Sequence, residues 1–293
     1  MQYYLAQVTM GVPTQRHHHP YLGEGQRITK GLQQLPNLKH LTLRRPMKST
    51  TTPASTTVLK YTLRWIQHYY LQLQSLDLEL DHCDLECLSQ LEDLRMLRFS
   101  GYSLTHPGRM RTLVYSLKRL KELHIIGPPP GFLWQQRHGQ RQNVVQSMTP
   151  EVLRAAPPLS ALTICDVVGV RSKRSGSNHV FLVPDMFQAL YDRHRDSLQS
   201  LDLFSDEALD PEATASLARF MTVATALRHL AVGWPEIDLR LVDCLPRSLR
   251  SVEVVVTNRV LAAAFAERLE GSRYRLPYLA KVSVHVGGSG GVM

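Results

Sequence analysis

A short apolar motif, Leu-x-x-Leu-x-Leu, constrains this chain more than any other feature of its 293 residues, because it recurs about ten times. Its last two apolar residues lie two positions apart. In a β-strand they therefore point to one side, and the residues between them point to the other. One copy alone cannot shield its apolar side chains from water, so neighbouring copies must stack around a shared core. The copies are Leu5/Val8/Met10, Leu38/Leu41/Leu43, Leu73/Leu76/Leu78, Leu94/Leu97/Phe99, Leu120/Leu123/Ile125, Leu159/Leu162/Ile164, Leu198/Leu201/Leu203, Leu227/Leu230/Val232, Leu249/Val252/Val254 and Leu279/Val282/Val284.

The spacing of the copies indicates the class of repeat. The middle apolar residues of successive copies lie 21 to 39 positions apart. The shorter steps are typical of leucine-rich repeats, and the longer ones imply inserted loops. The pattern predicts an α/β fold: a curved leucine-rich-repeat solenoid, or horseshoe, of about ten irregular repeats, with a parallel β-sheet on the concave face and helices on the convex face. The alternative is that common leucines match by chance, but the recurring order of amphipathic stretch, frequent proline and apolar triplet argues against it.

The segments between the triplets are expected to be helical where they are long enough. Apolar residues at helical spacing predict helices over 58–72, 184–197, 211–226 and 258–270. Asn258 is a candidate N-cap for the last of these helices, and Gly271 is a candidate stop.

We expect a single leucine-rich-repeat domain over residues 1–286, because each repeat of a solenoid contacts only its neighbours. Three stretches rich in Pro, Gly, Ser, Thr or Gln, at 46–57, 127–146 and 170–179, predict exposed inserted loops. The last two fall within the longest steps, and insertions of this kind often belong to a binding edge. The glycine-rich tail, 287–293, is expected to be disordered.

Composition excludes some classes of protein. Hydrophobic content of 43% and charged content of 20% are ordinary for a globular protein, and no run of 18 apolar residues exists that could span a membrane. The first residues lack the basic start and long apolar stretch of a secretory signal. The four cysteines, Cys83, Cys87, Cys165 and Cys244, are not placed as paired caps at the ends. These features predict a monomer in the cytoplasm or nucleus.

Positive charge is concentrated in one part of the sequence. The net charge is +9, and residues 107–174 hold eleven Lys and Arg against three acidic residues, which accounts for +8 of it. This basic region is a candidate site for nucleic acid or an acidic protein; the alternative is solvated helix faces and loops. Its candidate contact residues are Arg137, Arg141, Arg171, Lys173 and Arg174.

No residue pattern predicts catalysis, a cofactor or a metal. The nearest candidate is the segment 81–87, Asp-His-Cys-Asp-Leu-Glu-Cys, where two thiols and an imidazole lie close in sequence. A structural zinc site needs four ligands in a tetrahedron, and this segment lacks the fourth. His17, His18 and His19 are expected to form a solvated polar loop. We therefore expect a protein that is not an enzyme.

The residues that flank the inward-pointing ones would line the concave face of such a sheet. This row mixes acidic, basic and polar side chains, which suits a protein partner better than a phosphate backbone. The alternative is that these are ordinary surface residues. The candidate partner-binding residues are Asp77, Glu79, Arg98, His124, Asp202, Phe204 and Trp234, with the two aromatic side chains as anchors.

Several segments carry a resemblance to a known family. The segments LPNLKHLTL (35–43), LQSLDL (73–78 and 198–203) and LKRLKELHI (117–125), together with irregular repeat lengths and long inserts, resemble the leucine-rich-repeat region of fungal F-box proteins. The resemblance implies a non-catalytic scaffold for protein–protein interaction that recognises the substrate of an SCF-type ubiquitin ligase. No F-box-like segment is found in this sequence, so the resemblance does not extend to docking on the Skp1 adaptor.

Overall fold

The computed structural model describes residues 5–9, 20–44, 62–78, 83–127, 145–166 and 179–287. Contacts divide the chain into two compact units. The first unit comprises residues 1–124, 141–148 and 155–157, and the second comprises 125–140, 149–154 and 158–293. The prediction of a single domain over 1–286 stays a prediction.

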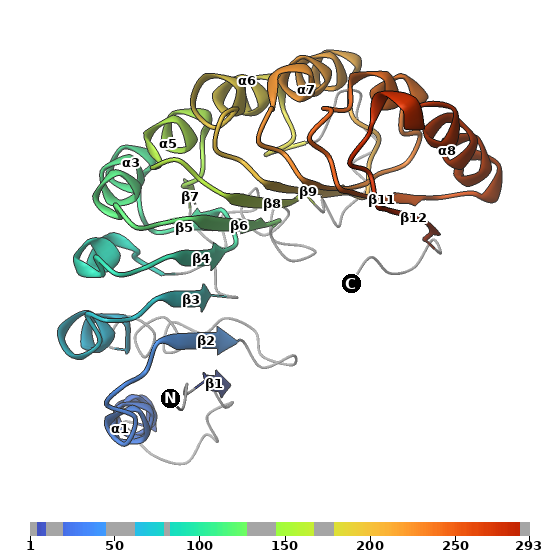
Figure 1. Cartoon of the computed structure of the whole chain (residues 1–293). Coiled ribbons are helices and arrows are strands. Elements are labelled where there is room, and N and C mark those ends of the chain that lie inside the picture. Colours follow the sequence, from blue (N-terminus) through green and yellow to red (C-terminus); the bar gives the residue numbers. More distant parts are fainter. Residues whose placement is uncertain are drawn as a thin grey trace, which may run out of the picture. The chain divides into compact units, whose positions relative to one another are not determined.

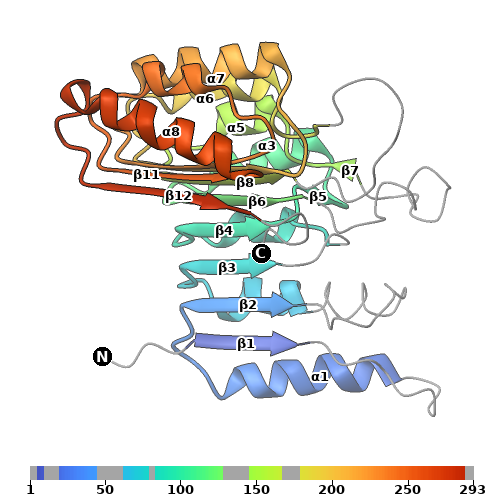
Figure 2. The same cartoon turned by 90° about the vertical axis from the view of Figure 1, so that its right-hand side faces the viewer.

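The first unit is built from parallel strands that follow one another in chain order. Strands β1 to β4 are neighbours in that order, and each adjacent pair is parallel. Figure 2 shows these strands running in the same direction. The elements are β1 (Leu5–Thr9), α1 (Pro20–Gln33), β2 (His40–Arg44), a helix over 62–69, β3 (Ser75–Leu78), the 3-10 helix η1 (Glu86–Gln90), β4 (Met96–Phe99) and α3 (Pro107–Ser116). Two short strands, β5 (Tyr102–Ser103) and β7 (Val145–Gln146), form a separate antiparallel pair.

The second unit repeats the same arrangement of parallel strands joined by helices. Strands β8 to β12 are parallel neighbours in chain order. Helices α6, α7 and α8 lie along one face of this sheet (Figure 1). Its elements are β8 (Ala161–Asp166), α6 (Pro184–Arg193), β9 (Ser200–Ser205), α7 (Pro211–Val223), β10 (His229–Gly233), η2 (Leu239–Cys244), β11 (Ser251–Val256), α8 (Arg259–Gly271), η3 (Arg273–Arg275) and β12 (Lys281–Val286). Strand β6 (Glu122–Ile126) and helix α5 (Pro150–Ala155) span the boundary between the units.

Most of the apolar triplets make the same two kinds of backbone hydrogen bond. The N–H of the first leucine closes a tight turn, as from Leu94 to the Leu91 carbonyl (3.0 Å) and from Leu279 to the Leu276 carbonyl (3.1 Å). The Leu159 N–H is an exception, because it donates to the His194 ring. The carbonyl of the next residue accepts two N–H groups from the following repeat. For Arg228 these come from Arg250 and Ser251, at 2.7 and 3.0 Å. The motif therefore sets both the turn before each strand and its link to the next repeat.

The triplets form the core, as the alternation of the sequence predicts. Strands β8, β9 and β11 alternate between buried and partly exposed residues. The register aligns equivalent positions across the second sheet, for example Leu201 with Leu230. The predicted frame of the first copy is wrong, because Ala6 and Val8, not Val8 and Met10, pair with Leu41 and Leu43. Alanine carries little hydrophobic signal, whereas Met10 is strongly apolar. The motif was therefore placed two residues too late in the sequence.

Three of the predicted helices are confirmed as α6, α7 and α8, and the described part of the fourth is helical over 62–69. Asn258 caps α8, since its side chain accepts a hydrogen bond from the Leu261 N–H. The C-cap of α8 is Ser272, one residue beyond the predicted stop. No helix among the described residues is long and apolar enough to cross a membrane. Loop 46–57 lies outside the described residues, as do most of 127–146, 170–179 and the tail 287–293.

Strand β12 lies at the end of the sheet, and its core-facing residues are less covered than those of β11. Val252 and Val282 occupy paired positions on these strands, yet Val252 is 2% exposed and Val282 is 38% exposed. We expect Val252→Ala to lower the free energy of unfolding by about 2 kcal/mol and Val282→Ala by under about 0.5 kcal/mol, because only the first substitution empties a closed core. Urea denaturation measures both; equal losses would mean that β12 is covered in solution.

Candidate protein interface

The outer face of the second sheet is the surface opposite the helix-covered core. The register of the strands places its side chains in two rows that cross all five strands, β8 to β12. The middle row contains Thr163, Asp202, Ala231, Glu253 and Ser283, and the end row contains Cys165, Phe204, Gly233, Val255 and His285. Most of these residues are partly exposed, and the middle row is polar where the end row is largely apolar.

The end row contains an apolar strip that depends on one glycine. A Cβ atom at Gly233 would lie 2.9 Å from Cδ1 of Phe204 and 3.0 Å from Cβ of Val255, closer than carbon atoms normally pack. The Phe204 ring and the Val255 side chain therefore both lie close to the glycine backbone, one from each neighbouring strand. We define Phe204, Gly233 and Val255 as the apolar strip. Its two side chains remain partly exposed.

Polar groups beside the strip contact one another within the sheet. The Thr163 hydroxyl donates to the Asp202 carboxylate (3.1 Å), and Nε2 of His285 lies 3.8 Å from the Glu253 carboxylate. The two rows hold two carboxylates and no Lys or Arg, so we expect this surface to fit a partner through shape and apolar contact more than through ionic attraction.

The predicted contact residues divide between the two units. Asp77 lies in β3 and is only 7% exposed, and its carboxylate is 3.6 Å from Nη1 of Arg98 in β4. Nε2 of His124 lies 3.9 Å from the Glu122 carboxylate. These three predicted residues belong to the first unit, whereas Asp202 and Phe204 belong to the second. Glu79 lies outside the described residues.

Trp234 is not an exposed anchor. It is 3% exposed, and it follows β10 at the position that continues the inward alternation of Leu230 and Val232. The same alternation places Gly233 outward, so sequence parity could have excluded Trp234 and selected Val255. The apolar strip was missed because a glycine gives no hydrophobic signal.

The candidate residues of the basic region, Arg137, Arg141, Arg171, Lys173 and Arg174, lie outside the described residues. Several described cations of that region have acidic partners. Arg109 lies 2.9 Å from Glu86, Arg154 lies 3.1 Å from Asp192, and Arg119 pairs with Asp93. These described cations are surface ion pairs rather than a track of unpaired charge.

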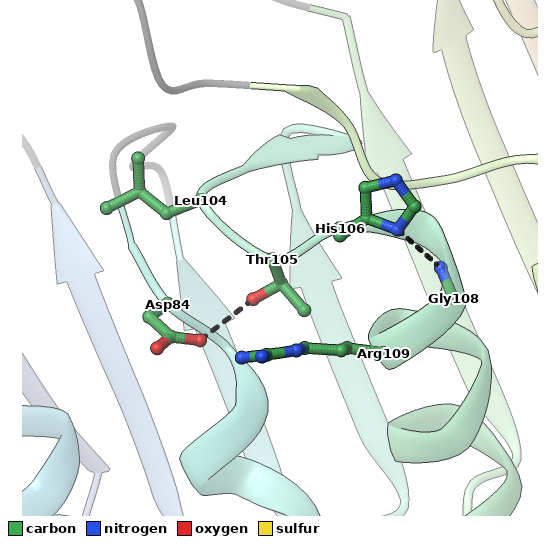
Figure 3. Close-up of a pocket in the computed structure, with 6 residues that line it drawn as sticks. All are labelled: Asp84, Leu104, Thr105, His106, Gly108 and Arg109. Carbon is green, nitrogen blue, oxygen red and sulfur yellow. Dashed lines mark hydrogen bonds between the residues drawn. The ribbon is translucent and has the colours of Figure 1, made fainter.

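A half-open pocket of about 450 Å³ lies in the first unit, at the start of α3 (Figure 3). Its polar groups hold the local backbone. The Asp84 carboxylate accepts hydrogen bonds from the Thr105 hydroxyl and the Glu86 N–H, both at 3.1 Å, and Nδ1 of His106 accepts from the Gly108 N–H. Each of these contacts stabilises a turn or a helix cap. The arrangement has no paired nucleophile and base.

Cys83 and Cys87 belong to the candidate zinc segment 81–87. Among the described residues, no cluster of three metal-binding side chains occurs. Burial, reinforced by the charge of Asp84, raises the pKa of the Cys87 thiol to about 12. Cys87 is therefore a thiol, not a thiolate, at neutral pH. Asp81 and His82 of the candidate segment lie outside the described residues.

A buried Asp166, His179 and Ser205 meet in the second unit but do not form a catalytic triad. Both Asp166 and Ser205 face Nδ1 of His179, at 3.7 and 3.4 Å, whereas Nε2 lies 2.8 Å from the Ala208 carbonyl. A triad needs the acid and the nucleophile on opposite ring nitrogens. Burial by itself lowers the pKa of His179, but contacts with Asp166 and the Ala208 carbonyl outweigh it and leave that pKa raised. The cluster is structural.

His194 is buried and neutral, which makes stability depend on pH. Its Nε2 donates to the Leu153 carbonyl (3.0 Å), and its Nδ1 accepts from the Leu159 N–H (3.3 Å). Burial, aided by the charge of Arg193, lowers the pKa of His194 to about 4. The unfolded chain, with a histidine pKa of about 6.5, takes up a proton first. Stability is therefore lost as pH falls from about 6.5 towards 4.

We expect this histidine to cost about 2 kcal/mol of stability between pH 7.5 and pH 5. His179 acts in the opposite direction, because its pKa is raised in the folded state. It adds stability below about pH 6.5, and this stability is lost as the pH rises through the raised pKa. The comparison of wild type with His194→Gln isolates the effect of His194. Urea denaturation of the variant should show a flatter pH profile, and an unchanged slope would contradict this assignment.

Comparison of the sequence with protein-family models and with curated proteins found no match.

Proposed function

We propose that this chain is a leucine-rich-repeat solenoid that binds another protein through the outer face of its second sheet, without catalysis. The observation that carries the proposal is the apolar strip: Phe204 and Val255 stay partly exposed and lie on either side of Gly233. A rigid aromatic side chain in an apolar setting, surrounded by polar groups, is the usual composition of an interface centre.

Support for the leucine-rich-repeat class comes from the backbone hydrogen bonds that recur at most of the triplets. It also comes from the parallel strands, which lie side by side in the order of the chain. Support for a protein partner comes from the polar groups beside the strip, which contact one another within the sheet. We further propose that the partner is a substrate of an SCF-type ubiquitin ligase, which rests on the resemblance of the repeats to those of fungal F-box proteins.

Affinity capture from a fungal cell extract tests this function. The tagged chain is purified with and without nuclease, and bound proteins are identified by mass spectrometry. We expect the same protein partner in both samples, at a yield that Phe204→Ser reduces and Tyr274→Ser leaves unchanged. Tyr274 is the matched control because it is aromatic, 83% exposed and lies in η3, outside the sheet.

Recovery of cullin and the adaptor with the partner would support the ligase assignment, and a partner without them would contradict it. A yield that vanished with nuclease would contradict protein binding and move the basic region to first place. Loss of the partner in both aromatic variants would also count against the apolar strip, because a general loss of solubility would then explain the result.

A further inference from the structure

Basic residues occupy equivalent positions at the starts of neighbouring strands in the second unit. Arg228 precedes β10 and Arg250 precedes β11, and the Arg250 N–H donates to the Arg228 carbonyl (2.7 Å). The matching residue before β12 is Ala280, so Lys281 lies one position further along, in register with Ser251, and its N–H also donates to the Arg250 carbonyl (3.1 Å). Adjacent strands are about 4.8 Å apart, so the two arginines lie side by side, and we define Arg228, Arg250 and Lys281 as the basic edge.

The cations of the basic edge differ from most arginines nearby. Arg240, Arg268, Arg273 and Arg275 each form an ion pair with an acidic residue. Within the described part of the chain, no ion pair involves Arg228, Arg250 or Lys281, and all three are exposed. Like charges on neighbouring strands repel one another, so this arrangement costs stability unless an anion binds.

A pocket adjoins the basic edge along the chain. It has a volume of about 420 Å³ and is lined in part by Thr225, Arg247, Ser248 and Arg275. Thr225 lies three residues before Arg228, and Arg247 lies three residues before Arg250. Asp243 also lines the pocket but pairs with Arg275, at 3.6 Å. The Ser248 hydroxyl already donates to the Leu227 carbonyl (2.7 Å), so Arg247 and the Thr225 hydroxyl are the groups that can receive a carboxylate from outside.

We propose that the basic edge, Arg228, Arg250 and Lys281, together with the pocket at Arg247, binds an acidic peptide segment of the partner protein. This inference rests on the proposed function, since it assigns a second contact to the same partner. Carboxylates of the segment follow the basic edge from strand to strand, and one acidic side chain enters the pocket. Charge complementarity selects the segment, and the row of strands sets its spacing.

A peptide fits this surface better than a nucleic acid does. The basic edge spans only three strands, whereas a phosphate backbone is held by a longer track of cations. Nucleic acid is nevertheless a direct competitor in the test, because both ligands are polyanions.

The test measures binding of a fluorescein-labelled peptide of twelve alternating Glu and Asp residues by anisotropy, with a labelled dT12 oligonucleotide as the competing probe. The variant is Arg228→Glu/Arg250→Glu. The control is Arg27→Glu/Arg259→Glu, which changes the net charge equally at two exposed helix positions. We expect the edge variant to bind the peptide at least about tenfold more weakly than wild type, and the control variant to bind within about twofold of it.

Equal weakening in both variants would overturn the proposal, because general attraction to a basic protein would then explain binding. Absence of saturable peptide binding, or tighter binding of dT12 than of the peptide, would also overturn it. Failure here is distinct from failure of the proposed function. A partner that is still captured through Phe204 while the edge variant binds it normally would reject the acidic segment alone.

Discussion

Truncation of Phe220 to alanine should lower the free energy of unfolding by about 4 kcal/mol, because the whole ring leaves a closed core. Phe220 lies in α7 and is fully buried, and its helix packs over the second sheet. A cavity of this size does not collapse in a densely packed interior, so the lost contacts add to the lost hydrophobic burial. Urea denaturation of the whole chain measures the loss.

Phe204→Ala provides the matched comparison, since the same ring is removed from the outer face of the sheet. We expect a loss of only about 1 kcal/mol, because Phe204 is partly exposed in the native state. Partner capture should respond in the opposite order: Phe204→Ala should weaken it, and a folded population of Phe220→Ala should retain it. If the two variants were equally destabilised, Phe204 would be a core residue and could not act as the exposed anchor of the interface.

Replacement of Asp166 by alanine should also destabilise the chain by about 4 kcal/mol, because three buried N–H groups lose their acceptor. The Asp166 carboxylate accepts hydrogen bonds from Val180, Phe181 and Leu182, at 2.9, 2.8 and 3.0 Å. These residues form the approach to α6, whose N-cap, Val183, gives no side-chain hydrogen bond of its own. Asp166 therefore fixes the start of that helix.

Asp166→Asn is the control, because its amide oxygen can still accept hydrogen bonds while the negative charge is removed. We expect it to lose less than half of the stability that Asp166→Ala loses, as measured by thermal and urea denaturation. If the two variants were equally unstable, the charge facing His179 would account for the effect, and the backbone contacts would not.

Much of the core could be predicted from the sequence, because the apolar triplets impose both a strand and a shared interior. Residues such as Leu201 and Leu230, which lie far apart in sequence, pair in the expected register. The predicted frame of the first copy failed because Ala6 and Val8 pair with Leu41 and Leu43, and alanine gives little hydrophobic signal in a sequence. The helix ends were also displaced, because caps such as Ser272 depend on local backbone geometry.

The candidate site was less predictable, because its features arise only when strands become neighbours. Arg228 and Arg250 look unrelated in the sequence, and the ladder between β10 and β11 brings them together. The role of Gly233 likewise depends on the Phe204 ring of the adjacent strand. Trp234 follows directly after a strand and was expected to be an exposed aromatic anchor. The alternation of that strand instead points its side chain into the core.

Site-specific photo-crosslinking tests the central claim most directly. Benzoylphenylalanine is placed at Phe204, on the outer face of the sheet, and in a second protein at Tyr274, which is exposed in η3. Each protein is irradiated with the captured partner, and crosslinked products are identified by mass spectrometry. We expect a crosslink to the partner from position 204 and none from position 274. A crosslink from position 274 alone would place the partner away from the outer face and contradict the proposed function.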